Sequence, residues 1–224
     1  MTRTMFRTAL LAVGILVLFA CVAVGQEYAL QDYMPQKIGS KWTVKQTGGR
    51  GEETLTIGIA STMDMGGTPV PLALTQAADG TPRSGALELV SADAYTLYGV
   101  MFGGRRGDGG GDGQLTTIPY DPPAAFPGKL TVGQSVEKAA KVGSGDQQRD
   151  VTIKLELAAV EDVTVPKGTF EDCLKLVYST QFGDRSMTRT IWYAKGVGAV
   201  KTERPGFGDR PSTVTELVDY ELPE

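Results

Sequence analysis

The sequence predicts an all-β fold: an antiparallel meander that forms a curved sheet, a half-barrel or a sandwich after an N-terminal signal segment. Hydrophobic residues alternate with polar ones along several segments, which is the period of a strand with one face in a core and the other in water. Short runs rich in glycine and proline separate these segments, as tight turns do. After the signal segment, no stretch has the spacing of an amphipathic helix.

The clearest strands are residues 55–59 and 151–157. In the second, Val151, Ile153 and Leu155 alternate with polar residues, so they should share one face. Composition predicts further strands, at residues 69–76, 86–90, 95–102, 170–180, 187–194, 199–203 and 213–222.

Turn chemistry fits the meander. Pro166 and Gly168 stand at the second and fourth positions of residues 165–168, which predicts a tight reversal between two strands. Residues 103–113 contain seven glycines and no apolar side chain, so we expect a mobile hairpin tip. Further turns are expected at residues 66–68, 78–80 and 195–198.

A weak internal echo relates residues 33–42 to residues 126–136, because each has an aromatic residue, a proline, a lysine and a glycine before a strand start. Either the chain consists of two similar halves that share one sheet, or the echo is a chance resemblance. In the first case, the proline-rich residues 117–127 would connect the halves.

The N-terminus has the pattern of an export signal. Arg3 and Arg7 precede an uncharged, mostly apolar run over residues 8–25. Cleavage after Gly25 would give a signal peptide of residues 1–25, whereas a lipobox-like site before Cys21 would give residues 1–20 and a lipid attached to Cys21. Residues 26–224 are expected to form a single all-β domain.

Charge and composition exclude several function classes. The chain has no histidine and two cysteines among 224 residues, which excludes His-based catalytic triads, His-ligated zinc and four-thiolate zinc sites. Its net charge of -4 becomes -6 once Arg3 and Arg7 leave with the signal, so we expect no nucleic-acid partner. No cofactor and no metal are expected.

Candidate reactive groups are few. Glu161, Asp162, Glu171 and Asp172 flank the predicted reversal and could in principle serve a carboxylate-based hydrolase, although adjacent acids in a hairpin are more often solvated. Asp108 and Asp112 lie in the glycine-rich segment but lack the spacing of a calcium loop. Cys173 is expected to be a small buried hydrophobe, because no histidine is present to activate it.

Three groups of residues resemble a known family: Tyr33-x-Pro35-x-x-x-Gly39-x-x-Trp42, then residues 163–173 around Pro166 and Cys173, then residues 192–198 with Trp192, Tyr193 and Gly196. Together they resemble an uncharacterised family of exported bacterial β-rich domains, often lipoproteins, called TapB-like. Lys195 stands where that pattern would have proline. The resemblance implies a curved sheet or half-barrel in the cell envelope and implies no reaction.

We therefore expect a non-enzymatic envelope domain that binds an apolar ligand such as lipid, or a partner protein. The alternatives are a structural interaction module of an envelope assembly and, third, a carboxylate-based hydrolase. The localisation expected is the periplasm, the outer membrane or the cell surface of a bacterium, with membrane attachment only through a lipid on Cys21.

Large rings in strands usually fill a core, but some could line a groove, and the candidates are Trp42, Trp192, Tyr98 and Tyr193.

Overall fold

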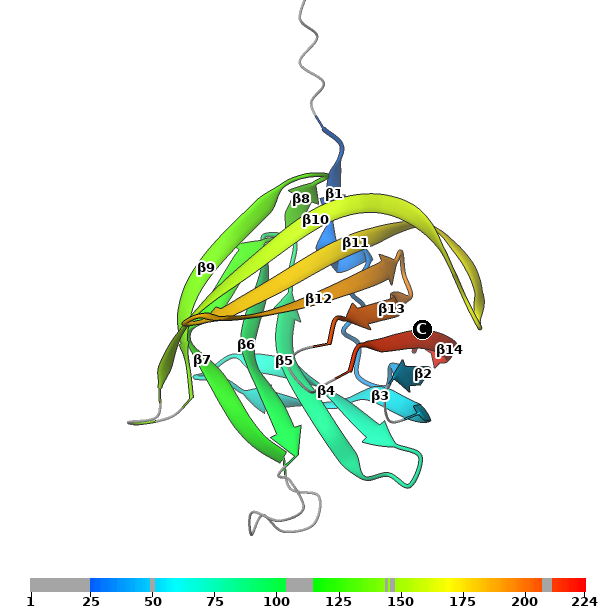
Figure 1. Cartoon of the computed structure of the whole chain (residues 1–224), viewed down its shortest axis with the longest axis horizontal. Helices are drawn as coiled ribbons and strands as arrows, with labels where there is room; N and C mark the ends of the chain where they lie inside the picture. The colour runs from blue at the N-terminus through cyan, green and yellow to red at the C-terminus, as the bar shows by residue number, and fades with distance from the viewer. Residues whose placement is uncertain (1–24, 49–50, 104–114, 144, 146–147, 207–210) are drawn as a thin grey trace, which may run out of the picture.

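The computed structural model describes residues 25–48, 51–103, 115–143, 145, 148–206 and 211–224. Within them, the main sheet is a closed barrel with the strand order β10-β11-β12-β13-β14-β2-β3-β4-β5-β6-β7-β9 (Figure 1). A separate two-stranded sheet pairs β1 with β8. The strands are β1 (Glu27–Ala29), β2 (Lys41–Gly48), β3 (Gly51–Asp64), β4 (Pro69–Ala77), β5 (Pro82–Val90), β6 (Ala94–Gly103), β7 (Leu115–Pro127), β8 (Lys129–Thr131), β9 (Ser135–Val142), β10 (Arg149–Val165), β11 (Gly168–Phe182), β12 (Arg185–Ala194), β13 (Gly198–Arg204) and β14 (Thr213–Glu221).

The all-β, antiparallel prediction is confirmed, and the sheet closes completely. Two pairings complete the ring: β14 pairs with β2, as at Tyr220 and Trp42, and β7 pairs with β9, as at Tyr120 and Val142. The predicted reversal at residues 165–168 is also confirmed, because Val165 pairs directly with Gly168. Closure leaves no free edge in the twelve-stranded sheet of the described residues.

One sequence prediction is wrong: residues 117–127 are not a connection but most of strand β7. The prolines there cannot donate hydrogen bonds, and the strand changes partner among them. Pro119 pairs with Gly99 of β6, Tyr120 and Asp121 pair with β9, and pairing with β6 resumes at Ala124. Each of the two similar segments, residues 33–42 and 126–136, comes at the start of six barrel strands, β2–β7 and β9–β14 respectively. The internal repeat itself stays a prediction.

Some predictions concern segments outside the described residues. These are the signal segment with Cys21 and nearly all of the glycine-rich segment, with Asp108 and Asp112. Within the described part of the chain, no helix is long and apolar enough to cross a bilayer.

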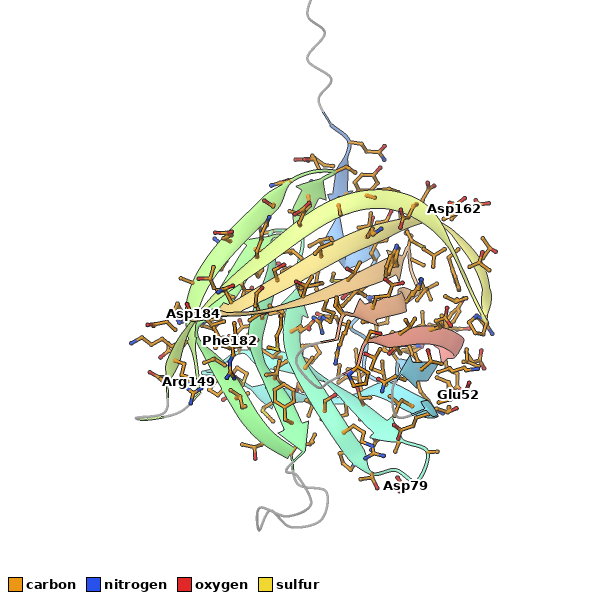
Figure 2. The ribbon with its side chains drawn as sticks, viewed as in Figure 1. Glu52, Asp79, Arg149, Asp162, Phe182 and Asp184 are labelled. Atoms are coloured by element: carbon orange, nitrogen blue, oxygen red, sulfur yellow. The ribbon has the colours of Figure 1, made fainter. Side chains whose placement is uncertain are left out.

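The barrel has two different ends, because every second connection of an antiparallel meander lies at the same end. The plug end carries the start of β2, the end of β14 and the β1–β8 sheet. The turn end is the opposite end, where the β4–β5 and β11–β12 turns lie. Figure 2 labels Asp79 and Asp184 at these two turns.

A short 3₁₀ helix, η1 (Leu30–Asp32), packs into the barrel at the plug end. Leu30 is completely buried, and Tyr33 and Met34 are buried beside it. The amide of Leu30 donates to the carbonyl of Gly128 at 2.9 Å, and the amide of Gly196 donates to the carbonyl of Asp32 at 2.7 Å. These bonds fix the segment to two separate barrel connections.

Three tyrosines from different strands meet inside the barrel. The hydroxyl of Tyr178 on β11 lies 3.4 Å from those of Tyr95 on β6 and Tyr193 on β12. Because β6 and β11 are not neighbours in the sheet, this contact crosses the interior and identifies the interior face of each strand. Burial raises the pKa of Tyr178 to about 12, so these hydroxyls are neutral hydrogen-bonding groups at physiological pH.

The β10–β11 hairpin extends past its neighbours, and its tip reaches β14 (Figure 1). The amide of Lys167 donates to the carbonyl of Leu217 at 3.0 Å, and its ammonium lies 2.5 Å from a carboxylate oxygen of Asp219. Beneath the tip, Val163 and Val165 pack in one buried cluster with Trp42. A further apolar cluster, which includes Leu72 and Leu87, occupies the opposite face of β4 and β5 from the interior.

Candidate functional site

Of the four aromatic candidates, only Trp42 and Trp192 share a buried cluster. Trp42, Trp192 and Tyr193 are all buried, and the indole N–H of Trp42 donates to the carbonyl of Val197 at 2.7 Å. Tyr98 lies at a bulge in β6 and packs against the cluster on the opposite face of the sheet from the interior. Tyr193 belongs to a different cluster from the two tryptophans, so the four rings line no common groove, and a ligand-binding role for them stays a prediction.

Trp192 contacts one of the predicted acidic residues, Glu161. Its indole N–H donates to Oε1 of Glu161 at 2.6 Å, and the ammonium groups of Lys175 and Lys201 lie 5.1 and 5.0 Å from its ring centroid. The Trp192 hydrogen bond, followed by that of Lys175, lowers the pKa of Glu161. A carboxylate held in its ionised form cannot serve as a general acid near neutral pH.

The other members of the acidic group have structural contacts. Oδ1 of Asp162 accepts the amide of Asp172 at 3.1 Å, and Asp172 has a φ of 51°, so this bond supports a backbone conformation that non-glycine residues seldom adopt. Cys173 is fully buried, and burial raises its thiol pKa to about 11. The prediction that Cys173 is a small buried residue is confirmed. The described residues contain no group of ligands that could hold a metal ion.

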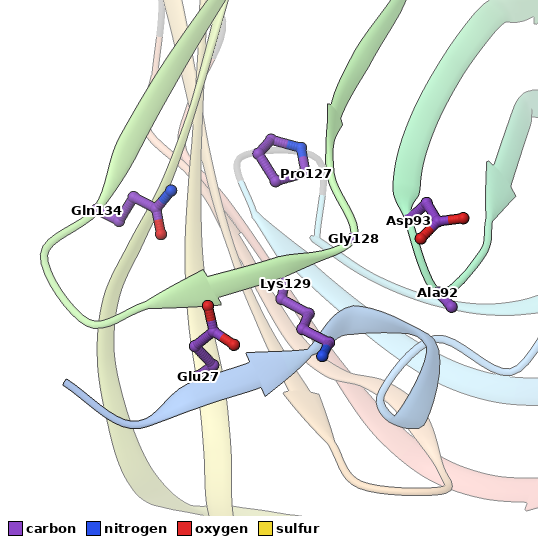
Figure 3. Close-up of a pocket in the computed structure, with 7 residues that line it drawn as sticks. All are labelled: Glu27, Ala92, Asp93, Pro127, Gly128, Lys129 and Gln134. Carbon is purple, nitrogen blue, oxygen red and sulfur yellow. The ribbon is translucent and has the colours of Figure 1, made fainter. Parts of the chain in front are cut away.

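A shallow, open hollow of about 450 Å³ lies at the plug end, where β8 leaves β7 (Figure 3). Its floor is a close backbone contact: a Cβ at Gly128 would lie 2.5 Å from the carbonyl oxygen of Ala92, and the amide of Gly128 donates to the carbonyl of Asp93 at 2.9 Å. Glycine is needed here for packing. The hollow therefore lies where the β1–β8 sheet joins the barrel.

The interior face differs at the turn end, because apolar side chains there remain partly exposed. Ile118 pairs with Val100 on neighbouring strands, and Phe182 lies on the same face of β11 as the buried Tyr178. All three, with Tyr120, are accessible to solvent, whereas the interior Leu155 and Leu157 nearer the plug end are 0% exposed. The interior is thus filled in one half and reached by solvent in the other.

The neighbouring wall of this half, on β12, β13, β14 and β2, is polar. The guanidinium of Arg189 lies over the ring of Tyr178, 4.7 Å from its centroid, so Arg189 faces the interior. Three polar residues continue the wall in one row of the sheet: Ile191 pairs with Thr202, Thr202 with Thr215 and Thr215 with Gln46. Sequence reasoning missed this site. Its signal was the alternation in β12, which places Arg189 on the face of Ile191 and Tyr193.

No family model matches the chain, and no curated protein matches it. Solved structures with a similar fold include a candidate lipoprotein from Parabacteroides distasonis, with 15% identity, a TM-score of 0.46, and coverage of 84% of this chain and 98% of that one. A candidate exported protein with YmcC-like fold from Bacteroides fragilis has 13% identity, a TM-score of 0.48, and coverage of 85% and 99%. The hypothetical lipoprotein YmcC from Escherichia coli has 8% identity, a TM-score of 0.39, and coverage of 87% and 89%. The TapB-like resemblance is not confirmed.

Proposed function

We propose that the chain is an exported, non-enzymatic envelope protein that binds an apolar ligand, such as a lipid, inside the turn end of its barrel. One observation carries this proposal: Val100, Ile118, Tyr120 and Phe182 point inward yet stay partly exposed. Apolar surface removed from water contributes roughly 25 cal/mol per Å². A ligand that covers these side chains would gain that energy before the costs of association.

The geometry favours a ligand inside the barrel over strand addition by a partner. A structural interaction module would offer an unpaired strand edge, and the main sheet of the described residues has none. The short β1–β8 sheet has free edges, but each of its strands has only three residues, which gives a partner few hydrogen bonds.

Intrinsic tryptophan fluorescence is unsuited to test this proposal, since Trp42 and Trp192 both lie in packed cores. The protein should instead be recovered from its native host without detergent, and its bound lipids identified by mass spectrometry. Dodecanoate and dodecanol should then be titrated into delipidated protein by calorimetry. We expect co-purified lipid and saturable binding of at least one of the two compounds.

Phe182→Asp places a charge among the inward apolar side chains (Figure 2 labels Phe182), so it should weaken binding of the apolar chain at least tenfold. The matched control is Ile38→Asp, because Ile38 is 58% exposed outside the barrel strands. Ile38→Asp should bind as the wild type does. A folded protein that carries no lipid and binds neither compound would contradict the proposed function.

A further inference from the structure

Two arginines face each other on the interior side of β12 and β13. The last paired residues of these strands are Thr190 with Glu203 and Ile191 with Thr202. Continuing this antiparallel register by one residue brings Arg189 opposite Arg204. Arg189 pairs on its other side with the interior Tyr178, and Arg204 pairs with Thr213. Like charges directly opposite each other destabilise a sheet, so this arrangement needs a separate reason.

The carboxylates around the pair have other partners. Among the ion pairs that the described residues form, none includes Arg189 or Arg204. Oε2 of Glu88 accepts the hydroxyl of Tyr95 at 2.9 Å, and Oε1 of Glu53 lies 2.8 Å from Arg83. Glu203 is on the other face of β13 and lies 2.7 Å from Lys201. Glu88 keeps its negative charge, because its partner hydroxyl is neutral, and it attracts Arg189 electrostatically. It therefore offsets one of the two arginines, and the interior wall keeps the positive charge of the other.

The surroundings of the two arginines keep their guanidinium groups charged and in a position to bind an anion. Arg204 is exposed to solvent, and desolvation of its guanidinium, together with the charge of Arg189, lowers its pKa to about 10. It stays charged at neutral pH. Arg189 is held in place by its contact with Tyr178. Two guanidinium groups side by side can donate parallel hydrogen bonds to the oxygens of one carboxylate or phosphate.

We propose that Arg189 and Arg204 bind the anionic head of an amphiphile, a carboxylate or phosphate, while its apolar chain covers Ile118, Val100 and Phe182. This inference rests on the proposed function and names the chemical class of its ligand. An apolar wall and a basic wall face the same interior half, which matches a molecule with one charged end and one apolar end.

The test compares four compounds by calorimetry: dodecanoate, dodecyl phosphate, dodecanol and inorganic phosphate. Wild-type protein should bind at least one of the two anionic amphiphiles at least tenfold more tightly than dodecanol, and should bind inorganic phosphate far more weakly. Equal affinity for the anions and dodecanol would overturn the arginine inference and leave the proposed function standing. Inorganic phosphate that binds as tightly as dodecyl phosphate would show that no apolar chain is used and would also overturn it.

Arg189→Gln and Arg204→Gln should each weaken binding of the anionic amphiphile at least tenfold and change dodecanol binding less than twofold. The control is Lys154→Gln, which removes the same charge from the outer face of β10 and should leave binding unchanged. Arg204→Gln should also unfold at the same temperature as the ligand-free wild type or higher, because its repulsion with Arg189 is relieved. Loss of stability together with loss of binding of every compound would mean that the arginines are structural, which contradicts the inference.

Discussion

The two halves of the barrel interior are enclosed by one continuous sheet, but their side chains are packed to different extents. Near the plug end, η1 and Leu130 complete a core in which Leu155 and Leu176 are inaccessible to solvent. At the turn end, Phe182 and Ile118 stay partly exposed, and the register of β12 and β13, continued by one residue, brings Arg189 opposite Arg204. Burial is therefore concentrated in one half, and the half in which we propose binding keeps apolar and charged side chains within reach of solvent.

The largest expected effect is a difference between the two halves in the free energy of unfolding that a large-to-small substitution removes. Leu155→Ala should lower the free energy of unfolding by about 2–5 kcal/mol, because it leaves a cavity in a packed core. Ile118→Ala at the turn end should cost only about 1 kcal/mol, since its side chain is already partly in water. Urea denaturation of both variants measures the difference. Equal costs would mean that the turn half is packed as densely as the plug half.

The next effect tests the tyrosine group between the halves. Tyr95→Phe removes a hydroxyl that donates to Glu88 and meets Tyr178. A hydrogen bond to a charged group in this setting should be worth about 1–2 kcal/mol. Chemical denaturation should show this loss, and Tyr98→Phe, with its ring on the other face, is the control. If Tyr95→Phe is as stable as the control, the polar group does not support the core.

A smaller effect is expected at the hairpin tip that closes the plug half. Gly168 has a φ of 144°, a conformation that favours glycine, so Gly168→Ala should destabilise through backbone strain. Pro166→Ala should cost about 0.4–1 kcal/mol by freeing the unfolded chain. Thermal unfolding of both variants checks this. Unchanged stability in both would contradict the role assigned to the reversal.

The smallest effect is a dependence on pH. The pKa of Glu161 lies below its ordinary value of 4.5, chiefly because of the Trp192 hydrogen bond. A lowered pKa stabilises the fold above that ordinary value, and the contribution is lost as pH falls through the folded-state pKa. Glu161 is partly exposed, so the contribution should be about 0.5 kcal/mol or less. In acid, Glu161→Gln should lose less stability than the wild type, and an identical acid profile would contradict this assignment.

The sequence predicted local features well and distant ones poorly. Alternation at residues 151–157 and the turn residues Pro166 and Gly168 act within a few positions, and the structure confirms both. Closure depends on pairings such as Tyr220 with Trp42, which no local pattern encodes. Strand β7 was missed because its prolines suggested a connection, whereas it spans two neighbours across them.

The arginine pair illustrates the same limit. The alternation of β12 already placed Arg189 on the face of Ile191, so its inward direction could have been predicted. Its approach to Arg204 depends on the bulge between Trp192 and Tyr193 and on the register of β13. Both are products of the whole sheet, since hydrophobic patterning and turn geometry together determine register.

A crystal structure of the protein with bound dodecanoate or dodecyl phosphate would test most directly whether the turn half of the interior is the binding site. We predict density for the anionic head between the guanidinium groups of Arg189 and Arg204, with the chain lying against Ile118 and Phe182. Density at the hollow beside Gly128 and Lys129, or on the outer face of the sheet, with the interior of the turn half unchanged, would contradict the account.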